Sequence, residues 1–277
     1  MMVFHSQGHQ GWTLTGLRIS SWEPWEENAG QKYVENVKNL RYFPSNITSS
    51  LRAGKYHLDM NSRDTLATEL NVLADFQPKV PTEALNADYV MLGNLDPNVQ
   101  ASVLDQMESR PKLIVLDTMN FWMDIALKDL HTVLKRVDVI TINDEEARQL
   151  SGEYSLVNAA KKIHLMGPKF VVIKKGEHGA LLFNDGKMFY APALPLAEVF
   201  DPTGAGDTFA GGFSGYIAKS EDISFESMKN AVIYGSNLAS FCVEKFGTER
   251  MEALQSDEVH ERLKVFKELT QFDIKLT

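Results

Sequence analysis

The stretch that organises this chain is Phe200-Asp201-Pro202-Thr203-Gly204-Ala205-Gly206-Asp207-Thr208-Phe209-Ala210-Gly211-Gly212. Beyond it, apolar residues recur at helical spacing, at Phe209, Phe213, Tyr216 and Ile217. The pattern predicts a glycine-containing loop that enters a helix. Because the first amides of a helix are unpaired and carry the positive end of its dipole, such a loop is an anion site.

Asp207 adds a carboxylate to the start of this predicted helix. A phosphate held by the amides would lie close to a group able to take a proton from an attacking hydroxyl, which suggests phosphoryl transfer. The alternative is structural, since an aspartate in the first helical turn commonly caps amides and Gly-Ala-Gly is also found in tight turns. For a single aspartate at a helix start, capping is the more common role.

The full string from Asp201 to Phe213 closely resembles the C-terminal signature of the PfkB-type (ribokinase-like) carbohydrate and nucleoside kinases. The resemblance implies that Gly204, Ala205, Gly206 and the Asp207 amide form an anion hole for the phosphoryl group of ATP. It also implies that Asp207 is the general base for the substrate hydroxyl, and that Thr203 contacts ATP.

Two other glycine-loop interpretations do not fit the stretch. A dinucleotide-binding fingerprint requires glycine where Phe209 stands after Gly204 and Gly206. The phosphate-loop pattern of the Walker type occurs nowhere in the chain.

Residues 87 to 174 alternate between predicted strands and helices. The expected strands are 87–92, 112–117, 137–142 and 170–174, and the expected helices are 97–108, 121–136, 145–151 and 156–166. Apolar strands separated by helices indicate a parallel sheet covered on both faces, with ligands at the carboxyl ends of the strands. Together with the resemblance, this predicts an α/β fold: a ribokinase-like three-layer sandwich with a mainly parallel sheet and a small β lid.

Asn143 and Glu146 follow the third of these strands. They have the spacing of a capping box, which accounts for them fully as structural residues. They also match the family's Asn-x-x-Glu motif, which is implied to hold Mg²⁺ and the ATP phosphates largely through water. An Mg²⁺ that keeps several waters needs only one or two such carboxylates.

Further residues are assigned to ligands by the resemblance. The segment 173–182 is similar to the family's Lys/Thr-x-Gly-x-x-Gly turn beside the nucleotide, which implies ATP contacts by Lys175, Gly176 and Gly179. Asn94 and Asp117 are implied on the substrate side, although the family's Asp-x-Asn region has one extra residue here. A predicted helix over 228–244 and the segment after it would line the adenine pocket with Asn237 and Gly247. A final helix is expected over 257–270.

The N-terminal part departs from the family pattern, because neither its opening strand nor its Gly-Gly-x-x-x-Asn stretch is recognisable. We therefore expect an atypical segment over 1–50, lid strands over 51–76 and an ATP-binding core over 77–277. Extended segments at 52–60 and 68–73 would form the lid, the alternative being an ordinary edge hairpin. An exposed lid strand would allow two subunits to pair.

The composition limits the possible partners. A net charge of −9 argues against nucleic acid binding through a broad basic surface. Cys242 is the only cysteine, which excludes an intramolecular disulfide and fits a reducing cytoplasm. No apolar run approaches the roughly 18 residues of a membrane span.

The sequence thus predicts an ATP- and Mg²⁺-dependent phosphotransferase acting on a hydroxyl of a sugar or nucleoside. The alternative is a non-catalytic or truncated nucleotide-binding relative.

Overall fold

The structure is a computed structural model, and it describes residues 2–5, 13–16, 51–57, 60 and 63–271. The chain divides into two compact units, one of Met1–Gly16 with Pro78–Thr277 and one of Leu17–Gln77. Most of the segment predicted as atypical, residues 1–50, lies outside the described residues. The predicted domain boundaries at residues 50 and 76 stay predictions.

The larger unit is built on an eight-stranded sheet with the order β10-β9-β8-β7-β6-β5-β1-β2. Its central strands are parallel, and these are β5 (Tyr89–Leu92), β6 (Leu113–Asp117), β7 (Val139–Asn143) and β8 (Phe170–Lys174). The flanking strands are antiparallel, and these are β9 (Ala180–Asn184), β10 (Lys187–Ala191), β1 (Met2–His5) and β2 (Thr13–Gly16). Almost every residue of the parallel strands is buried, as expected for strands covered on both faces.

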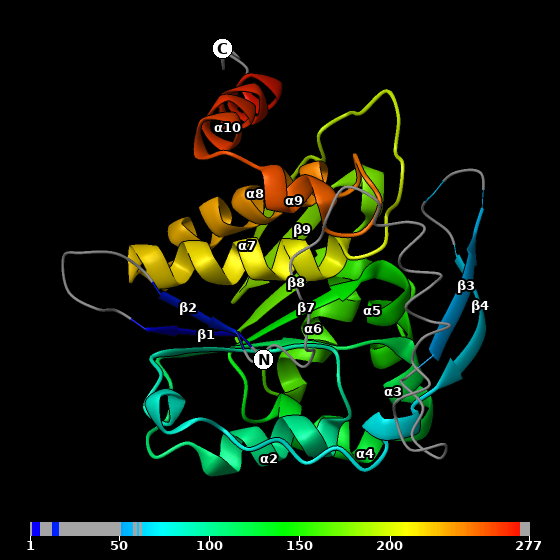
Figure 1. The fold of residues 1–277 in the computed structure, drawn as a ribbon, viewed down its shortest axis with the longest axis vertical. Coiled ribbons are helices and arrows are strands. Elements are labelled where there is room, and N and C mark those ends of the chain that lie inside the picture. The colour runs from blue at the N-terminus through cyan, green and yellow to red at the C-terminus, as the bar shows by residue number, and fades with distance from the viewer. Residues whose placement is uncertain (1, 6–12, 17–50, 58–59, 61–62, 272–277) are drawn as a thin grey trace, which may run out of the picture. The chain divides into compact units, whose positions relative to one another are not determined.

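Helices cover both faces of this sheet (Figure 1). One layer holds α2 (Pro97–Gln106), α3 (Asn120–Ile125), α4 (Leu127–Leu134), α5 (Asp144–Ser151) and α6 (Leu156–Met166). The other layer holds α7 (Ala205–Ser220) and α8 (Phe225–Cys242), followed by α9 (Glu249–Ala253) and α10 (Ser256–Thr270). Short 3₁₀ turns occur at Thr82–Ala84 and Gly176–His178.

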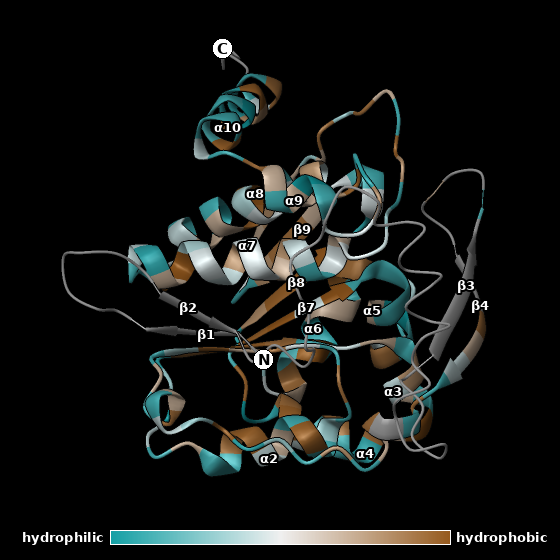
Figure 2. Ribbon diagram, viewed as in Figure 1, coloured by the Kyte–Doolittle hydropathy of each residue, from teal (hydrophilic) through white to brown (hydrophobic). Residues whose placement is uncertain are grey.

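Alternate strand residues point into two hydrophobic cores, one on each face of the sheet. Val90, Ile140 and Ile173 belong to the core beneath α2, α4, α5 and α6. Met91 and Val172 belong to the core that α7 and α8 close. Figure 2 shows this apolar interior as the brown strands β7 and β8 between teal and white helix surfaces. The three-layer α/β fold predicted from the sequence is confirmed.

Helix boundaries follow local signals in the sequence. The Asp96 carboxylate accepts a hydrogen bond from the Asn98 amide (2.7 Å) with Pro97 at the first helical position of α2. Gly152, in the left-handed conformation with φ of 70°, ends α5. Within the described residues, no helix combines the length and the apolar content needed to cross a membrane.

Two predictions about this unit were wrong or incomplete. The single helix expected over 121–136 is instead α3 and α4, which meet at Ala126 with φ −138° and ψ 30°. Because the buried Met123, Leu130 and Leu134 keep helical spacing across the break, periodicity does not reveal it. The β9–β10 hairpin was not predicted either, and its outer strand exposes Met188 and Tyr190.

The smaller unit contains a two-stranded antiparallel sheet of β3 (Leu51–Tyr56) and β4 (Arg63–Glu69). The register shifts between Ala53 and Gly54, a place where glycine suits a bulge. A strand pair was expected here, but its limits were wrong: Arg63 and Asp64 belong to β4, and Asn71–Leu73 forms a 3₁₀ turn.

Candidate active site

Polar side chains gather at the carboxyl ends of β6, β7 and β8. Asp117 pairs in register with Thr141, and Asn143 pairs with Lys174. Strand residues two apart share a face, and Val115, Val139 and Val172 all pack in the core beneath α7 and α8. Asp117, Thr141 and Lys174 therefore lie on the α7 side of the sheet.

Lys174 and Asp117 form an ion pair at this edge. The Lys174 ammonium donates to Oδ1 of Asp117 (3.1 Å), and the Thr141 hydroxyl donates to the same oxygen (3.2 Å). The side chains of Lys174 and Asp117 are only 18% and 8% exposed. Charges this far removed from water persist because each is paired and hydrogen-bonded.

The start of α7 faces this ion pair. Gly204 is the N-cap residue in the left-handed conformation (φ 84°), and no side-chain hydrogen bond caps this helix within the described part of the chain. The Ala205 amide donates to the Pro202 carbonyl (3.2 Å), so an anion at this helix start would meet the next amides, of Gly206 and Asp207. A Cβ atom added to Gly206 would lie 3.4 Å from Nζ of Lys174.

Three carboxylates act on the Lys174 ammonium. Burial opposes its charge, but the attraction of Asp117, Glu146 and Asp207, with the hydrogen bond that Lys174 donates to Asp117, outweighs burial and raises the Lys174 pKa above its usual value. The lysine is consequently protonated at neutral pH. Of these three predicted residues, Asp117 contacts Lys174 directly, and Glu146 and Asp207 act on its charge.

Asn143 and Glu146 form the capping box that their spacing predicted. The Glu146 amide donates to Oδ1 of Asn143 (2.8 Å), and the Asn143 amide donates to Oε2 of Glu146 (2.8 Å). No cluster of three or more histidine, cysteine or acidic side chains suited to a metal occurs among the described residues. The donor set fits a hard cation that keeps most of its water, as Mg²⁺ does, and does not fit a fully protein-ligated metal.

The loop before α7 is held by the end of α8. The Val243 carbonyl accepts from the amides of Phe200 (2.8 Å) and Asp201 (3.3 Å), and the Cys242 thiol lies 3.8 Å from the Thr203 carbonyl. The Asp201 carboxylate accepts from the Thr203 amide (2.9 Å), which closes the turn. Burial raises the pKa of the Cys242 thiol, so this contact involves a neutral group.

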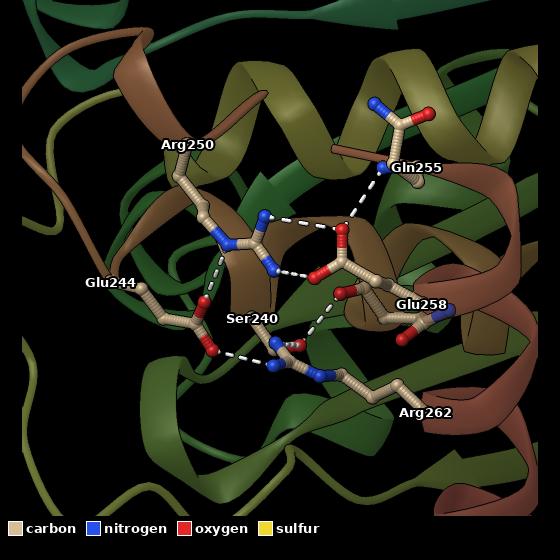
Figure 3. Close-up of polar contacts among 7 residues, drawn as sticks. Ser240, Glu244, Arg250, Gln255, Glu258 and Arg262 are labelled. Atoms are coloured by element: carbon tan, nitrogen blue, oxygen red, sulfur yellow. Dashed lines mark hydrogen bonds and ion pairs between the residues drawn. The ribbon is translucent and has the colours of Figure 1, made fainter. Parts of the chain in front are cut away.

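A polar cluster fixes this end of α8 to α9 and α10 (Figure 3). Glu244 pairs with Arg250 (2.9 Å) and Arg262 (2.5 Å), Arg250 pairs with Glu258, and Arg262 donates to the Ser240 hydroxyl (3.0 Å). Both guanidinium groups also lie over the ring of Phe241, 4.9 and 3.3 Å from its centroid. Bidentate and stacked arginines of this kind hold backbone segments in register.

Gln100 joins the ends of β5 and β6. Its side-chain amide donates to the carbonyls of Gly93 (2.8 Å) and Asp117 (3.1 Å). Asn94, which follows Gly93 in the chain, accepts a hydrogen bond from the indole nitrogen of Trp122 (3.0 Å). The two residues predicted for the substrate side, Asn94 and Asp117, are therefore on neighbouring, cross-linked strand ends.

The remaining predicted residues have structural contacts of their own. The Lys175 amide donates to the Gly179 carbonyl (2.8 Å), and a Cβ on Gly179 would lie only 2.0 Å from the Ala191 carbonyl oxygen. Asn237 is fully buried and donates to the Val259 carbonyl of α10 (3.0 Å). Gly247, with φ of 60°, follows α8. The Asn237 contact runs to α10 and not to the cluster around Lys174.

Lys174 is the residue that sequence reasoning missed, although it stands at the first position of the Lys/Thr-x-Gly-x-x-Gly pattern and Lys175, which was predicted instead, stands at the second. Strand alternation contained the signal. Counting by twos from the buried Val172 places Lys174 on the α7 face and Lys175 beyond the strand end.

A cavity of about 410 Å³ bordered by Ile114 and Arg110 lies at the other end of β6, away from these groups.

The sequence profile of the pfkB family carbohydrate kinases matches residues 47–254, and the chain belongs to this family. A cytidine kinase from Thermococcus kodakarensis is 34% identical over 143 residues, which cover 50% of each chain. A ribokinase from Arabidopsis thaliana is 33% identical over 121 residues, 42% of this chain and 31% of the ribokinase. The matched region thus spans half or less of these curated relatives.

Solved structures share the fold. Ribokinase from Thermotoga maritima superposes with a TM-score of 0.61 at 21% identity, covering 86% of this chain and 78% of the ribokinase. The nucleoside kinase of Methanocaldococcus jannaschii gives a TM-score of 0.61 at 20% identity, covering 84% and 76%. At this identity the likeness establishes the ribokinase-like α/β fold.

Proposed function

We propose that the protein is an ATP-dependent kinase that transfers a phosphoryl group to a hydroxyl of a sugar or nucleoside. The observation that carries the proposal is the meeting of the α7 start with the β6–β8 ends around one buried cation, in a chain of the pfkB family. An uncapped helix start attracts an anion, and an acidic side chain in its first turn can accept a proton.

In this proposal Asp207 is the general base. It takes the proton of the acceptor hydroxyl as the oxygen attacks phosphorus, while amides of the Gly204–Asp207 turn stabilise the charge that develops on the phosphoryl oxygens. Thr203 would contact the nucleotide from the loop that Val243 anchors. Asn94 and Asp117 would bind the acceptor at the ends of β5 and β6.

ATP is proposed as the donor and Mg²⁺ as its counter-ion. When bound, Mg²⁺ would neutralise phosphate charge, with Asn143 and Glu146 holding its water shell. Lys175, Gly176 and Gly179 would border the nucleotide, and Asn237 and Gly247 would border its base. The cytidine kinase and ribokinase relatives favour a ribose-containing acceptor.

We also propose that the β3–β4 hairpin acts as the lid over the acceptor, and that two subunits pair through it. The motivating feature is Leu66 on β4, whose side chain is 67% exposed. Size-exclusion chromatography with light scattering tests the pairing: Leu66→Lys should shift a dimer to a monomer, and a wild-type monomer would refute it.

The decisive assay measures ATP consumption by the full chain with Mg²⁺ against a panel of sugars and nucleosides. Asp207→Asn should lower the rate by about 10²- to 10⁴-fold, as removal of a positioned base does, while ATP binding persists. An Asp207→Asn protein that stays fully active would refute the assignment of the base. Saturable ATP binding without phosphorylation of any acceptor would favour the alternative, a non-catalytic nucleotide-binding relative.

A further inference from the structure

The end of α8, residues 240–244, is held on one side by two arginines (Figure 3). Arg262 of α10 donates to the Ser240 hydroxyl (3.0 Å) and pairs with Oε1 of Glu244 (2.5 Å). Arg250 of α9 pairs with Oε2 of the same carboxylate (2.9 Å). Both guanidinium groups lie over the ring of Phe241. Two later helices are therefore joined to the α8 end through three of its residues.

The other two residues of the α8 end contact the loop that leads into α7. The Val243 carbonyl accepts hydrogen bonds from the amides of Phe200 (2.8 Å) and Asp201 (3.3 Å). A Cβ atom on Gly204, the N-cap residue of α7, would lie 3.8 Å from the sulfur of Cys242. Contacts with the arginines and contacts with the loop thus alternate within one short segment, so a shift of the segment on one side displaces the other.

Glu244 lies where a carboxylate is unfavourable by itself. It follows the carboxyl end of α8, which carries the negative end of the helix dipole. Arg250 and Arg262, each with a side chain only 18% exposed, compensate by binding one carboxylate oxygen each. Ion pairs removed from water seldom stabilise a fold more than apolar residues of the same size do. A carboxylate that bridges two helices instead fixes their geometry.

We propose that Glu244 is a positioning residue for phosphoryl transfer. This role rests on the proposed kinase function. By joining α9 and α10 to the α8 end, Glu244 fixes the Val243 carbonyl and, through the loop amides bound to it, the Gly204–Asp207 turn. A displacement of that turn by about 1 Å would move Asp207 and the amides away from the reacting atoms, a change that costs about 100-fold in rate.

Glu244→Gln tests the role with little change of shape. One carboxylate oxygen becomes an amide nitrogen, so one of the two guanidinium groups meets a donor in place of an acceptor. Glu258→Gln is the matched control, because it makes the same change in the same cluster. Glu258 contacts Arg250 and the Gln255 amide, and its printed partners do not include the α8 end. Both variants should lower the thermal midpoint.

Hydrogen exchange of the unliganded full chain, followed by mass spectrometry, reports on the loop without any need for turnover. In Glu244→Gln the amides of Phe200 and Asp201 should exchange about tenfold faster, as expected when a hydrogen bond to a charged group is lost nearby. In Glu258→Gln they should exchange at the wild-type rate. Glu244→Asp, which keeps the carboxylate, should recover part of the protection.

Steady-state kinetics separate positioning from general weakening. In Glu244→Gln, kcat should fall by about tenfold to a hundredfold, while KM for ATP and for the acceptor changes by less than about threefold. This pattern is expected because the turn acts on the transition state, and other residues are proposed to bind the two substrates. In Glu258→Gln, kcat should stay within about twofold of the wild type.

Three outcomes would overturn the role of Glu244: equal loop exchange in the two variants, faster exchange with an unchanged kcat, or a loss of kcat/KM that comes from KM alone. The exchange result separates this role from the proposed function. A selective effect on exchange in a protein whose wild type shows no turnover keeps the hold of Glu244 on the loop and refutes the kinase. Wild-type turnover without a selective effect refutes the role of Glu244 and keeps the kinase.

Discussion

A Cβ atom at Gly206 would lie 3.4 Å from the ammonium of Lys174. Because residue 206 is glycine, the Lys174 side chain at the end of β8 approaches the backbone of α7 closely. The close approach brings a helix start and a strand end to the same small space. It is a relationship between residues 32 positions apart in the sequence, counted from 174 to 206.

Gly206→Ala should separate stability from activity. Within a helix alanine is more favourable than glycine by roughly 0.5–1 kcal/mol, and the flexible end of Lys174 can yield to a methyl group, so the thermal midpoint should stay equal or rise. The methyl would occupy the phosphate space, and turnover should fall by at least about tenfold, as small displacements in an active site do. Calorimetric unfolding and the ATP-consumption assay measure both; unchanged turnover would show that this space is not used.

Gln100→Leu should loosen the ends of β5 and β6. The Gly93 and Asp117 carbonyls would lose a buried donor, at a cost of about 1–3 kcal/mol. Because Asn94 and Asp117 lie at these ends, the KM for the acceptor should rise more than the KM for ATP. Gln149→Leu, which removes only an exposed bond to Asp124, is the control and should change stability by less than about 0.5 kcal/mol. An equal effect of both variants in urea unfolding would contradict the cross-link.

Gly179→Ala should destabilise the fold far more than Gly186→Ala. Both glycines have positive φ, 78° and 76°, and Gly179 also has a ψ of −148°, a region that is essentially restricted to glycine. Only the Gly179 Cβ would meet another atom, the Ala191 carbonyl oxygen at 2.0 Å, whereas nothing lies within 4 Å at Gly186. Denaturant unfolding of the two variants gives the difference; similar losses would mean that the β10 edge shifts freely.

Glu258→Gln should alter the acid end of the stability profile. Hydrogen bonds from Arg250, and then from the Gln255 amide, hold the pKa of Glu258 below its ordinary range. A depressed folded-state pKa stabilises the protein above the ordinary value, about 4.3, and that contribution is lost as pH falls through the folded-state pKa. Thermal midpoints of wild type and variant should therefore differ at pH 7 and converge only as pH falls beyond the ordinary value and through the lowered folded-state pKa. Parallel profiles would contradict the linkage.

The fold was largely predictable because its central strands are buried on both faces. The runs Leu113–Asp117 and Phe170–Lys174 are apolar and continuous, and the helix Leu156–Met166 was predicted to the residue. The edge hairpin escaped notice because exposed apolar residues such as Tyr190 blur its alternation. The break at Ala126 depends on tertiary packing that a periodic pattern does not record.

A candidate site could be predicted where its residues are contiguous in the sequence, as they are from Asp201 to Phe213. The site residues could not be predicted where their place depends on the face of the sheet to which a strand side chain points. Lys175 was predicted as a nucleotide contact although the Lys/Thr-x-Gly-x-x-Gly pattern begins at Lys174, and the role of Lys175 stays a prediction. Gln100 was overlooked because a helical glutamine carries no motif, and its partners are backbone carbonyls 7 residues before it and 17 residues after it.

The paired lysines at the end of β8 have a consequence for how the gene can change. Loss of one residue within β8 would move every later side chain to the opposite face, and Lys175 would then occupy the place of Lys174. Gain of one residue would instead bring the apolar Ile173 to that place. Because two lysines stand in tandem, a single-codon deletion in this strand would keep a lysine at this place, whereas a single-codon insertion would remove it.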